Sequence, residues 1–468
     1  MLMRYRIEKD QLGVLQVPAE AYYGIETLRG KENFEITKRG ICRQLIKSLA
    51  IVKKAAAKAN VDAENIDEKV GKAIMLACDE ILNGRLHGQF VTDLIQGGAG
   101  TSMNMNINEV VANRANELLG GRKGTYEFVH PLNHVNLSQS TNDVVQTAGK
   151  IAVIKQLKKL QVELKKLINV FQDKANEFND VIRIGRTHLQ EAVPITLGQQ
   201  FNSYANGLTK DLKRIELAID LLSEVNMGGT IIGTGINTND KYKKKVIFYL
   251  GKFSGEQVKL PKDLIDATRN LDGFGYTSSN LKLLSLNLSR IANDIRLMSS
   301  NILSELSLPY VQPGATIMPG KYNPVVPEML NQVSFYVAGL DTTISMALEA
   351  GQLELNAFIP VILMSLFEQL STLRRGIRTF NTLGISGLQI NKAVNNISEN
   401  YIYLITLLAP HIGYDLARQI VTESKETNAS IKEILINKNI LSEKDIDKIL
   451  SNSNVLNNNI NIEELIKN

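Results

Sequence analysis

Apolar residues recur every three or four positions over long stretches in the middle of the chain, which is the period of a helix rather than of a strand. The clearest stretches cover residues 153–171, 201–222, 284–302 and 330–348, with a fifth candidate at 363–380. Helices of this length bury their apolar stripes by packing against one another. The pattern therefore predicts an all-α protein with a central bundle of long helices.

The flanking segments carry shorter helical patterns. Residues before 140 predict short helices interrupted by Gly and Asn, and the residues after 390 predict short helices that end in an Asn-rich segment at 452–461. Such a segment is typical of a solvated, loosely ordered tail. We expect three helical domains: an N-terminal domain at 1–140, the central bundle at 141–390 and a small C-terminal domain at 391–468.

Composition narrows the class of protein. Hydrophobic residues make up 44% and charged residues 22% of 468 residues, as in an ordinary globular protein. A net charge of +5 gives no sign of nucleic-acid binding. No apolar run approaches the roughly 18 residues of a membrane span, and the first residues lack the apolar core of a signal peptide. We expect a cytoplasmic protein with no nucleic-acid or membrane partner.

The two cysteines, Cys42 and Cys78, stand within apolar helical patterns. No CxxC spacing or neighbouring His pair suggests a metal. We interpret both as buried thiols.

Four polar segments interrupt the helical pattern, at residues 96–106, 134–143, 185–190 and 313–328. The first contains three glycines followed by Thr101, and it is either a helix cap or a place of close backbone approach. The second is dominated by Ser, Thr, Asn, Gln and Asp directly before the longest predicted helix. Hydroxyls and free amides at a helix start would bind a carboxylate well.

The third and fourth segments carry the remaining candidate chemistry. His188, next to Thr187, lies in a turn that starts at Gly185 between two long helical stretches. It is either a structural residue or an acid, a base or an anion donor. Residues 313–328 hold four of the chain's 11 prolines and two glycines, a composition typical of a binding loop or lid. Lys321 within it could neutralise a substrate charge.

These four segments resemble the ordered motifs of the aspartase/fumarase superfamily. Residues 313–328 resemble its signature loop, G-S-S-x-M-P-x-K-x-N-P, and the Val-Val-Pro-Glu continuation is closer to aspartases than to fumarases. The other three resemble GAGTSxNMNxNE, HVNxSQSTND and GRTHLQ, in the same order. The similarity runs from Arg6 to Tyr414, almost the whole chain.

The resemblance implies an all-helical homotetramer with a twenty-helix core and active sites built from three subunits. It implies cleavage of a C–N or C–O bond in a small amino-acid or dicarboxylate substrate, with no metal and no cofactor. Dense hydrogen-bond donors would stabilise the dianionic aci-carboxylate that forms when the proton next to a carboxylate is removed. Motif positions assign the carboxylate next to the acidic carbon to Thr101, Ser140 and Thr141, the leaving amine to Asn142 and His188, and the other carboxylate to Thr187, Lys321 and Asn323.

The sequence also departs from the family. Ala315 stands where the family has its general base, the first Ser of the loop, and Ala cannot accept a proton. Thr316 keeps a hydroxyl at the position of the second Ser. The candidate catalytic residues are Thr316, His188 and Lys321, with Ala315 at the position of the family's base. Three other differences accompany this change: Tyr322 in place of a small aliphatic residue, Gln146 and Lys150 in place of Pro and His, and a shorter lead-in at 300–305.

Three hypotheses stay open. The chain is an aspartase-type lyase with aspartate as the leading substrate, and either Thr316, Tyr322 or a water acts as the base or the activity is much reduced. Alternatively, it is a lyase for another amino-acid-like substrate, whose altered loop and Gln146/Lys150 pocket remake the acid/base pair. The third hypothesis is a non-catalytic relative that binds dicarboxylates or acts as a structural subunit.

Overall fold

The structure is a computed structural model that describes residues 4–391 and 401–451. Its contacts divide the chain into two compact units, each assembled from separate parts of the sequence. The first unit comprises Met1–Glu163, Asp211–Leu286 and Gln332–Gly376; the second comprises Leu164–Lys210, Asn287–Asn331 and Ile377–Asn468. Each unit is described by itself below.

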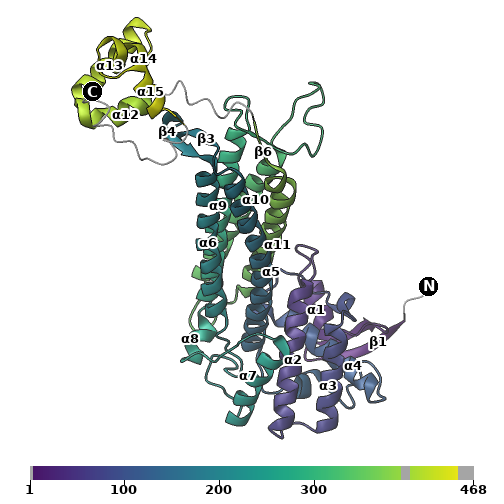
Figure 1. The fold of residues 1–468 in the computed structure, drawn as a ribbon. Coiled ribbons are helices and arrows are strands. Elements are labelled where there is room, and N and C mark those ends of the chain that lie inside the picture. Colours follow the sequence, from purple (N-terminus) through teal and green to yellow (C-terminus); the bar gives the residue numbers. More distant parts are fainter. Residues whose placement is uncertain (1–3, 392–400, 452–468) are drawn as a thin grey trace. The chain divides into compact units, whose positions relative to one another are not determined.

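Long helices dominate the structure, as the apolar periodicity predicts (Figure 1). They are α5 (Thr141–Glu177), α6 (Leu197–Leu222), α9 (Asp272–Met298), α10 (Val325–Glu349) and α11 (Ile359–Leu383). Each of them contributes residues to both units. In the first unit, a Cβ placed on Gly149 of α5 would lie 2.7 Å from Leu363 of α11 and 3.4 Å from Phe274 of α9, so these helices pack closely. The all-α class with a central bundle is confirmed.

One predicted helix boundary is wrong. The stripe at 284–302 predicts a helix through Ile302, but α9 ends at Met298 and Ile302 is exposed. Ser300 donates its hydroxyl to the carbonyl of Leu297 at 2.7 Å, and Ser304 has a φ of 49°. Serine side chains that bond to nearby backbone compete with helix continuation.

The first unit also contains shorter elements. These are β1 (Tyr5–Asp10), β2 (Gly13–Pro18), α1 (Ile25–Asn33), α2 (Arg43–Asp62), α3 (Glu68–Leu82), η1 (His87–Gln89), η2 (Gly98–Gly100), α4 (Thr101–Leu118), η3 (Pro131–Val135), α7 (Asp240–Ser254) and α8 (Leu264–Arg269). Strands β1 and β2 form an antiparallel hairpin. Buried Glu109 of α4 accepts hydrogen bonds from the backbone amides of Gly24, Glu26 and Thr27, which caps α1.

The second unit contains an aromatic core and two antiparallel strand pairs. Phe171, Phe201, Tyr204 and Phe380 pack with ring centroids 5.7 to 6.5 Å apart. The strands are β3 (Ile182–Thr187), β4 (Gln190–Thr196), β5 (Leu306–Ser307) and β6 (Gln389–Ile390), and β3 pairs with β4 as β5 pairs with β6. The short η4 (Ile385–Gly387) precedes β6.

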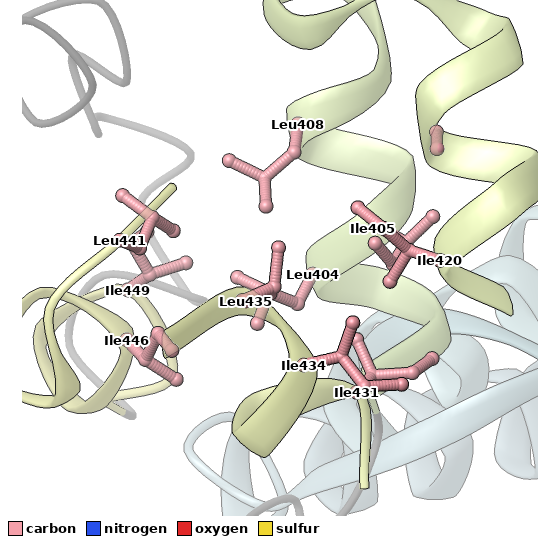
Figure 2. Packing of buried hydrophobic residues seen from close by; sticks show 11 residues of the cluster. Leu404, Ile405, Leu408, Ile420, Ile431, Ile434, Leu435, Leu441, Ile446 and Ile449 are labelled. Atoms are coloured by element: carbon pink, nitrogen blue, oxygen red, sulfur yellow. The ribbon is translucent and has the colours of Figure 1, made fainter. Parts of the chain in front are cut away.

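The C-terminal helices of this unit form their own apolar cluster (Figure 2). They are α12 (Tyr401–Ile412), α13 (Tyr414–Thr427), α14 (Ile431–Asn437) and α15 (Glu443–Ile449). Leu404, Leu408, Leu435 and Ile446 are fully buried in it. Burial of these side chains from four short helices stabilises an arrangement that none of them would hold alone.

The remaining sequence predictions concern the domain boundaries, the Asn-rich segment, the cysteines and membrane-spanning helices. The domain boundaries near 140 and 390 stay a prediction, and the Asn-rich segment at 452–461 lies outside the described residues. Cys78 is buried as predicted, whereas Cys42 is only half-buried; both are free thiols. None of the helices in the described part of the chain is long and apolar enough to cross a membrane.

The aromatic core of the second unit yields a stability prediction. Phe171→Ala removes a fully buried ring that contacts three other rings, so the free energy of unfolding should fall by about 3–5 kcal/mol. Urea unfolding followed by circular dichroism measures this loss. Phe248→Ala is the matched control, because the Phe248 ring is 61% exposed, and its effect should stay within about 0.5 kcal/mol. Equal losses in the two variants would contradict the prediction.

Candidate active site

The glycine-rich segment forms a tight turn at the start of α4. Gly98, Ala99 and Gly100 have φ values of 77°, 55° and 91°, three consecutive left-handed residues. A Cβ on Gly100 would lie 3.1 Å from Val145 of α5, so the starts of the two helices approach closely. Thr101 follows, exposed, and donates its hydroxyl to the carbonyl of Gly98 at 2.7 Å. Close backbone approach therefore explains the glycines better than capping alone.

The start of α5 carries the next three candidate residues. The Thr141 hydroxyl accepts a hydrogen bond from Asn104 of α4 at 3.1 Å, and the Ser140 hydroxyl accepts one from the amide of Asn142 at 3.3 Å. All three candidates are half-buried. Hydroxyls beside the positive end of a helix dipole form a suitable site for a carboxylate. Thr101, Ser140, Thr141 and Asn142 are thus brought together in the first unit.

Buried Asp143 fixes this helix start in place. Its carboxylate accepts hydrogen bonds from the backbone amides of Ser140 at 2.9 Å and of Gly228 and Thr230 at 3.1 Å. Complete burial raises the pKa of Asp143 to about 6. The side chain of Asn142 donates to the carbonyl of Ile231 at 2.7 Å. The start of α5 is therefore tied to the 228–231 loop by Asp143 and Asn142 together.

A buried lysine that the sequence patterns missed supports the same region. Lys53 of α2 is fully buried and donates to the side-chain oxygens of Asn136 at 3.0 Å and Gln139 at 2.9 Å. The same oxygen of Asn136 accepts from Asn104 and Asn108, each at 3.2 Å. Burial lowers the pKa of Lys53 to about 7. A lysine inside the apolar, Ala-rich run of α2 was the signal that could have revealed this network.

Gln146 and Lys150 do not line this group of hydroxyls. Gln146 is buried and donates to the carbonyl of Thr268 at 2.7 Å. Lys150 donates to the carbonyl of Glu224 at 2.8 Å, and burial lowers its pKa to about 8. Both side chains hold neighbouring backbone against α5. These contacts favour a structural role over the acid/base pair considered in the second hypothesis.

Thr187 and His188 lie at the exposed tip of the hairpin formed by β3 and β4. His188 and Leu189 form its two-residue turn, with φ values of 55° and 62°. This turn type normally uses Asn-Gly, because both positions need the left-handed conformation. The sequence predicted only a turn between helices here. A strained, non-glycine turn at an exposed tip is typical of a functional position.

The signature loop is closed at its neck by Gly314. A Cβ on this residue would lie 2.2 Å from the carbonyl oxygen of Lys321, and the side chain of Asn323 donates to the Gly314 carbonyl. Ala315 and Thr316 follow the neck directly, and the Thr316 side chain is exposed. Only glycine allows the two ends of the loop to touch in this way.

A polar cavity of about 420 Å³ lies beside this neck. Lys321 supplies its positive charge, and the lining contains several asparagines and serines but no carboxylate. Tyr322 packs edge-on against Tyr310, with ring centroids 4.5 Å apart. The lining residues include Ser299, Asn301, Ser304, Tyr310, Lys321, Tyr322, Asn323 and Asn391. The cavity suits an anionic, strongly hydrogen-bonding ligand.

The candidate residues thus fall into two sets. The first unit holds the hydroxyl and amide set at the starts of α4 and α5, and the second unit holds the His188 hairpin and the signature loop with Lys321. Within residues 4–391 and 401–451, no group of three or more His, Cys, Asp or Glu side chains could bind a metal ion.

The structure is a helical bundle that carries hydroxyls, amides and one loop lysine on its connectors. The family model described as Lyase matches residues 13–339, and the one described as Fumarase C C-terminus matches residues 404–457. The chain belongs to the aspartase/fumarase superfamily.

Several relatives resemble the chain over nearly its whole length. The aspartate ammonia-lyase of Bacillus subtilis is 48% identical over 96% of this chain and 95% of its own length. That of Helicobacter pylori strain J99 is 45% identical over 96% and 98%. The fumarate lyase:delta crystallin of Brucella melitensis, in its cobalt-bound crystal structure, has a TM-score of 0.92 at 42% identity, and the class II fumarase of Schistosoma mansoni has 0.94 at 33%. Both structures cover 98% of this chain and 100% of their own.

Replacing Lys53 by Met should change how stability depends on pH. The unfolded lysine keeps its proton up to its ordinary pKa of 10.5, whereas burial lowers the folded pKa to about 7. Between these values the unfolded state binds more protons, so the folded state gains stability as the pH rises. The unaltered protein should gain stability over this range relative to Lys53→Met. Urea unfolding at several pH values measures the difference.

A matched control is available on α3, where Lys69 is exposed. Lys69→Met should follow the pH trend of the unaltered protein. If Lys53→Met also follows that trend, Lys53 does not titrate as a buried group.

Proposed function

We propose that the chain is an aspartase-type carbon–nitrogen lyase. It eliminates ammonia or a substituted amine from aspartate or a related amino acid, giving fumarate or a related unsaturated acid. The observation that carries this proposal is the presence of two groups of hydroxyl and amide side chains that could bind carboxylates, one at the starts of α4 and α5 and one at the neck of the signature loop. A substrate with two carboxylates needs both. The 48% identity to the Bacillus subtilis aspartate ammonia-lyase supports the same reaction.

In the proposed reaction, Thr101, Ser140 and Thr141 bind the carboxylate next to the acidic carbon. A base removes the proton from that carbon, and the electron pair of the C–H bond moves toward the carboxylate. The resulting dianion is stabilised by hydroxyl donors and by the start of α5. Positioning by Asn104 and Asp143 keeps these donors in place before the substrate arrives.

The second half of the reaction breaks the bond to nitrogen. Lys321 and Asn323 bind the other carboxylate, and Thr187 contributes a hydroxyl. Asn142 and His188 face the amine, which leaves with the electron pair of the C–N bond. The strained turn presents His188 at an exposed tip, where it can reach a bound ligand.

Because the family's serine is absent, we look for the base among the other residues of the loop. Ala315 carries only a methyl group, while the exposed hydroxyl of Thr316 is on the next residue of the same loop. Tyr322 packs against Tyr310. We propose Thr316 as the base, because its neighbour occupies the position where the family places its serine.

Assembly and location belong to the same proposal. We propose a cytoplasmic homotetramer whose sites combine residues of three subunits. Large apolar side chains that stand exposed on the long helices support self-association, among them Leu217 of α6 and Phe335 and Met346 of α10.

Ala315 itself favours a second candidate, a non-catalytic homologue that binds dicarboxylates or acts as a structural subunit. An assay separates the two. Purified protein is mixed with aspartate, with malate and with N-substituted aspartates, and fumarate is followed by its ultraviolet absorbance. Product from aspartate or an N-substituted aspartate supports the proposed lyase, whereas product from malate alone would indicate C–O cleavage instead. Tight succinate binding without product from any substrate would establish the second candidate.

Restoring the serine should raise the rate. Ala315→Ser returns the family's base to the loop. A general base typically accelerates the reaction by about 10²–10⁴-fold. The expected result is an increase in kcat of that order with aspartate, with little change in KM. Ala315→Gly is the control, since it changes the side chain without adding a hydroxyl. Equal rates in the two variants would show that a serine introduced at position 315 does not act as a base in this chain.

The two remaining loop hydroxyls can be compared directly. Thr316→Val removes the proposed base and keeps the side-chain shape, so kcat should fall by about 10²-fold or more. Tyr322→Phe keeps the ring contact with Tyr310 and should leave the rate nearly unchanged. A larger loss in Tyr322→Phe would identify Tyr322 as the base instead.

A further inference from the structure

One buried carboxylate lies between the two catalytic segments of the second unit. Glu305 is on the lead-in to the signature loop, three positions before Leu308. Its Oε2 atom lies 2.9 Å from Nε of Arg183, and its Oε1 atom lies 2.7 Å from Nη1 of Arg186. Both arginines are on strand β3, whose end carries Thr187 and His188. A single side chain therefore joins the hairpin to the lead-in.

The shape of the hairpin makes this double contact feasible. Residues three apart on a regular strand point to opposite faces, yet Arg183 and Arg186 reach the same carboxylate. The pairing of β3 with β4 shifts register between Ile184 and Arg186, as in a β-bulge, which increases the local twist. A Cβ on Gly185 would lie 2.9 Å from the carbonyl oxygen of Val193, so glycine permits this irregularity.

Further hydrogen bonds fix the arginine side of the contact. Arg183 donates to Gln200 at 2.9 Å, Gln200 donates to the Tyr204 hydroxyl at 2.6 Å, and that hydroxyl donates to Asp294 at 2.9 Å. The hairpin is thereby connected to α6 and α9.

The glutamate side is equally fixed. The amide of Glu305 donates to the carbonyl of Met298 at 2.8 Å, and its carbonyl accepts from the amide of Asn391 at 3.1 Å. The next two residues pair with β6 as strand β5. Beyond them, from Tyr310 to Asn323, most of the loop is exposed. Glu305 is thus among the last firmly held residues before the loop.

Burial raises the free-energy cost of this ion pair, because its charges lose contact with water. The side chains of Arg183 and Glu305 are 7% and 8% exposed. Replacing a buried ion pair by apolar residues is often neutral or stabilising, so such a pair is weak evidence for a role in stability. The contact instead fixes geometry, because a carboxylate with two guanidinium partners holds both in one orientation.

We propose that Glu305 is a positioning residue that locks the His188 hairpin and the entry of the signature loop into one geometry. The inference rests on the proposed function, since it assigns ligand binding to both segments. It extends that function by making the two segments respond together. Contact of a dicarboxylate with the loop then orders the hairpin, and loss of Glu305 uncouples them.

The experiment uses Glu305→Gln in the full-length protein, because Gln keeps the size of the side chain and removes its charge. Glu191→Gln is the matched control: Glu191 pairs with the same Arg186 at 3.2 Å but is 53% exposed and belongs to the hairpin itself. Amide hydrogen exchange of residues 183–191 and 308–324 is measured with and without succinate. This readout does not depend on turnover.

A fluorescence reporter gives a second measurement. The chain contains no tryptophan, so Tyr310→Trp places a single tryptophan in the loop. Succinate titrations of this reporter, alone and combined with each Gln variant, give the dissociation constant and the size of the loop response. Where activity is measurable, kcat and KM are determined alongside.

Succinate should slow exchange in both segments of the unaltered protein and of Glu191→Gln. In Glu305→Gln, exchange of the hairpin should be faster and should no longer respond to succinate, the dissociation constant should rise about tenfold, and kcat should fall more than KM rises. Unchanged hairpin exchange in Glu305→Gln, or an equal effect of Glu191→Gln, would overturn the proposal. If Glu305→Gln does not fold, Arg186→Gln removes only half of the contact and is judged by the same criteria. Absence of lyase activity with hairpin coupling intact would refute the proposed function and leave the role of Glu305 standing.

Discussion

The mutual burial of apolar stripes along α5, α6, α9, α10 and α11 is the constraint on which the rest of the structure depends. A helix interior satisfies its own backbone hydrogen bonds, whereas a helix start leaves free backbone amides. The main candidate residues lie at helix starts and connectors: Thr101 and Thr141 begin helices, His188 lies in a hairpin turn, and Lys321 lies in a loop. The long helices supply rigidity, and the connectors supply the donors.

Buried charged side chains then hold the connectors in place. Lys53 supports the loop before α5, Asp143 ties the start of α5 to the 228–231 loop, and Glu305 joins the hairpin to the lead-in of the signature loop. Each is expensive to bury and each makes several hydrogen bonds, which is how such groups are tolerated. Because these hydrogen bonds reach separate connectors, they constrain the connectors, and pre-organised catalysis requires such constraint.

Under the proposed function, Ala315 distinguishes substrate binding from proton removal. The residues proposed to bind two carboxylates are present, whereas Ala315 has only a methyl group where the resemblance implies a serine base. Binding residues and the base make different contributions, because donors stabilise the dianion and the base removes one proton. The loop retains the closed neck at Gly314 and a hydroxyl at Thr316, both beside Ala315.

The sequence by itself determined the helical class, the bundle, the family and the positions of the polar connectors, because apolar periodicity and short motifs are local properties. It placed His188 in a turn but not in a β-hairpin, and it extended α9 past Met298. Only the tertiary structure revealed the contacts of Lys53, Gln146 and Glu305. Their partners are far away in the chain, and a buried charge looks like any other lysine or glutamate until the fold shows what surrounds it.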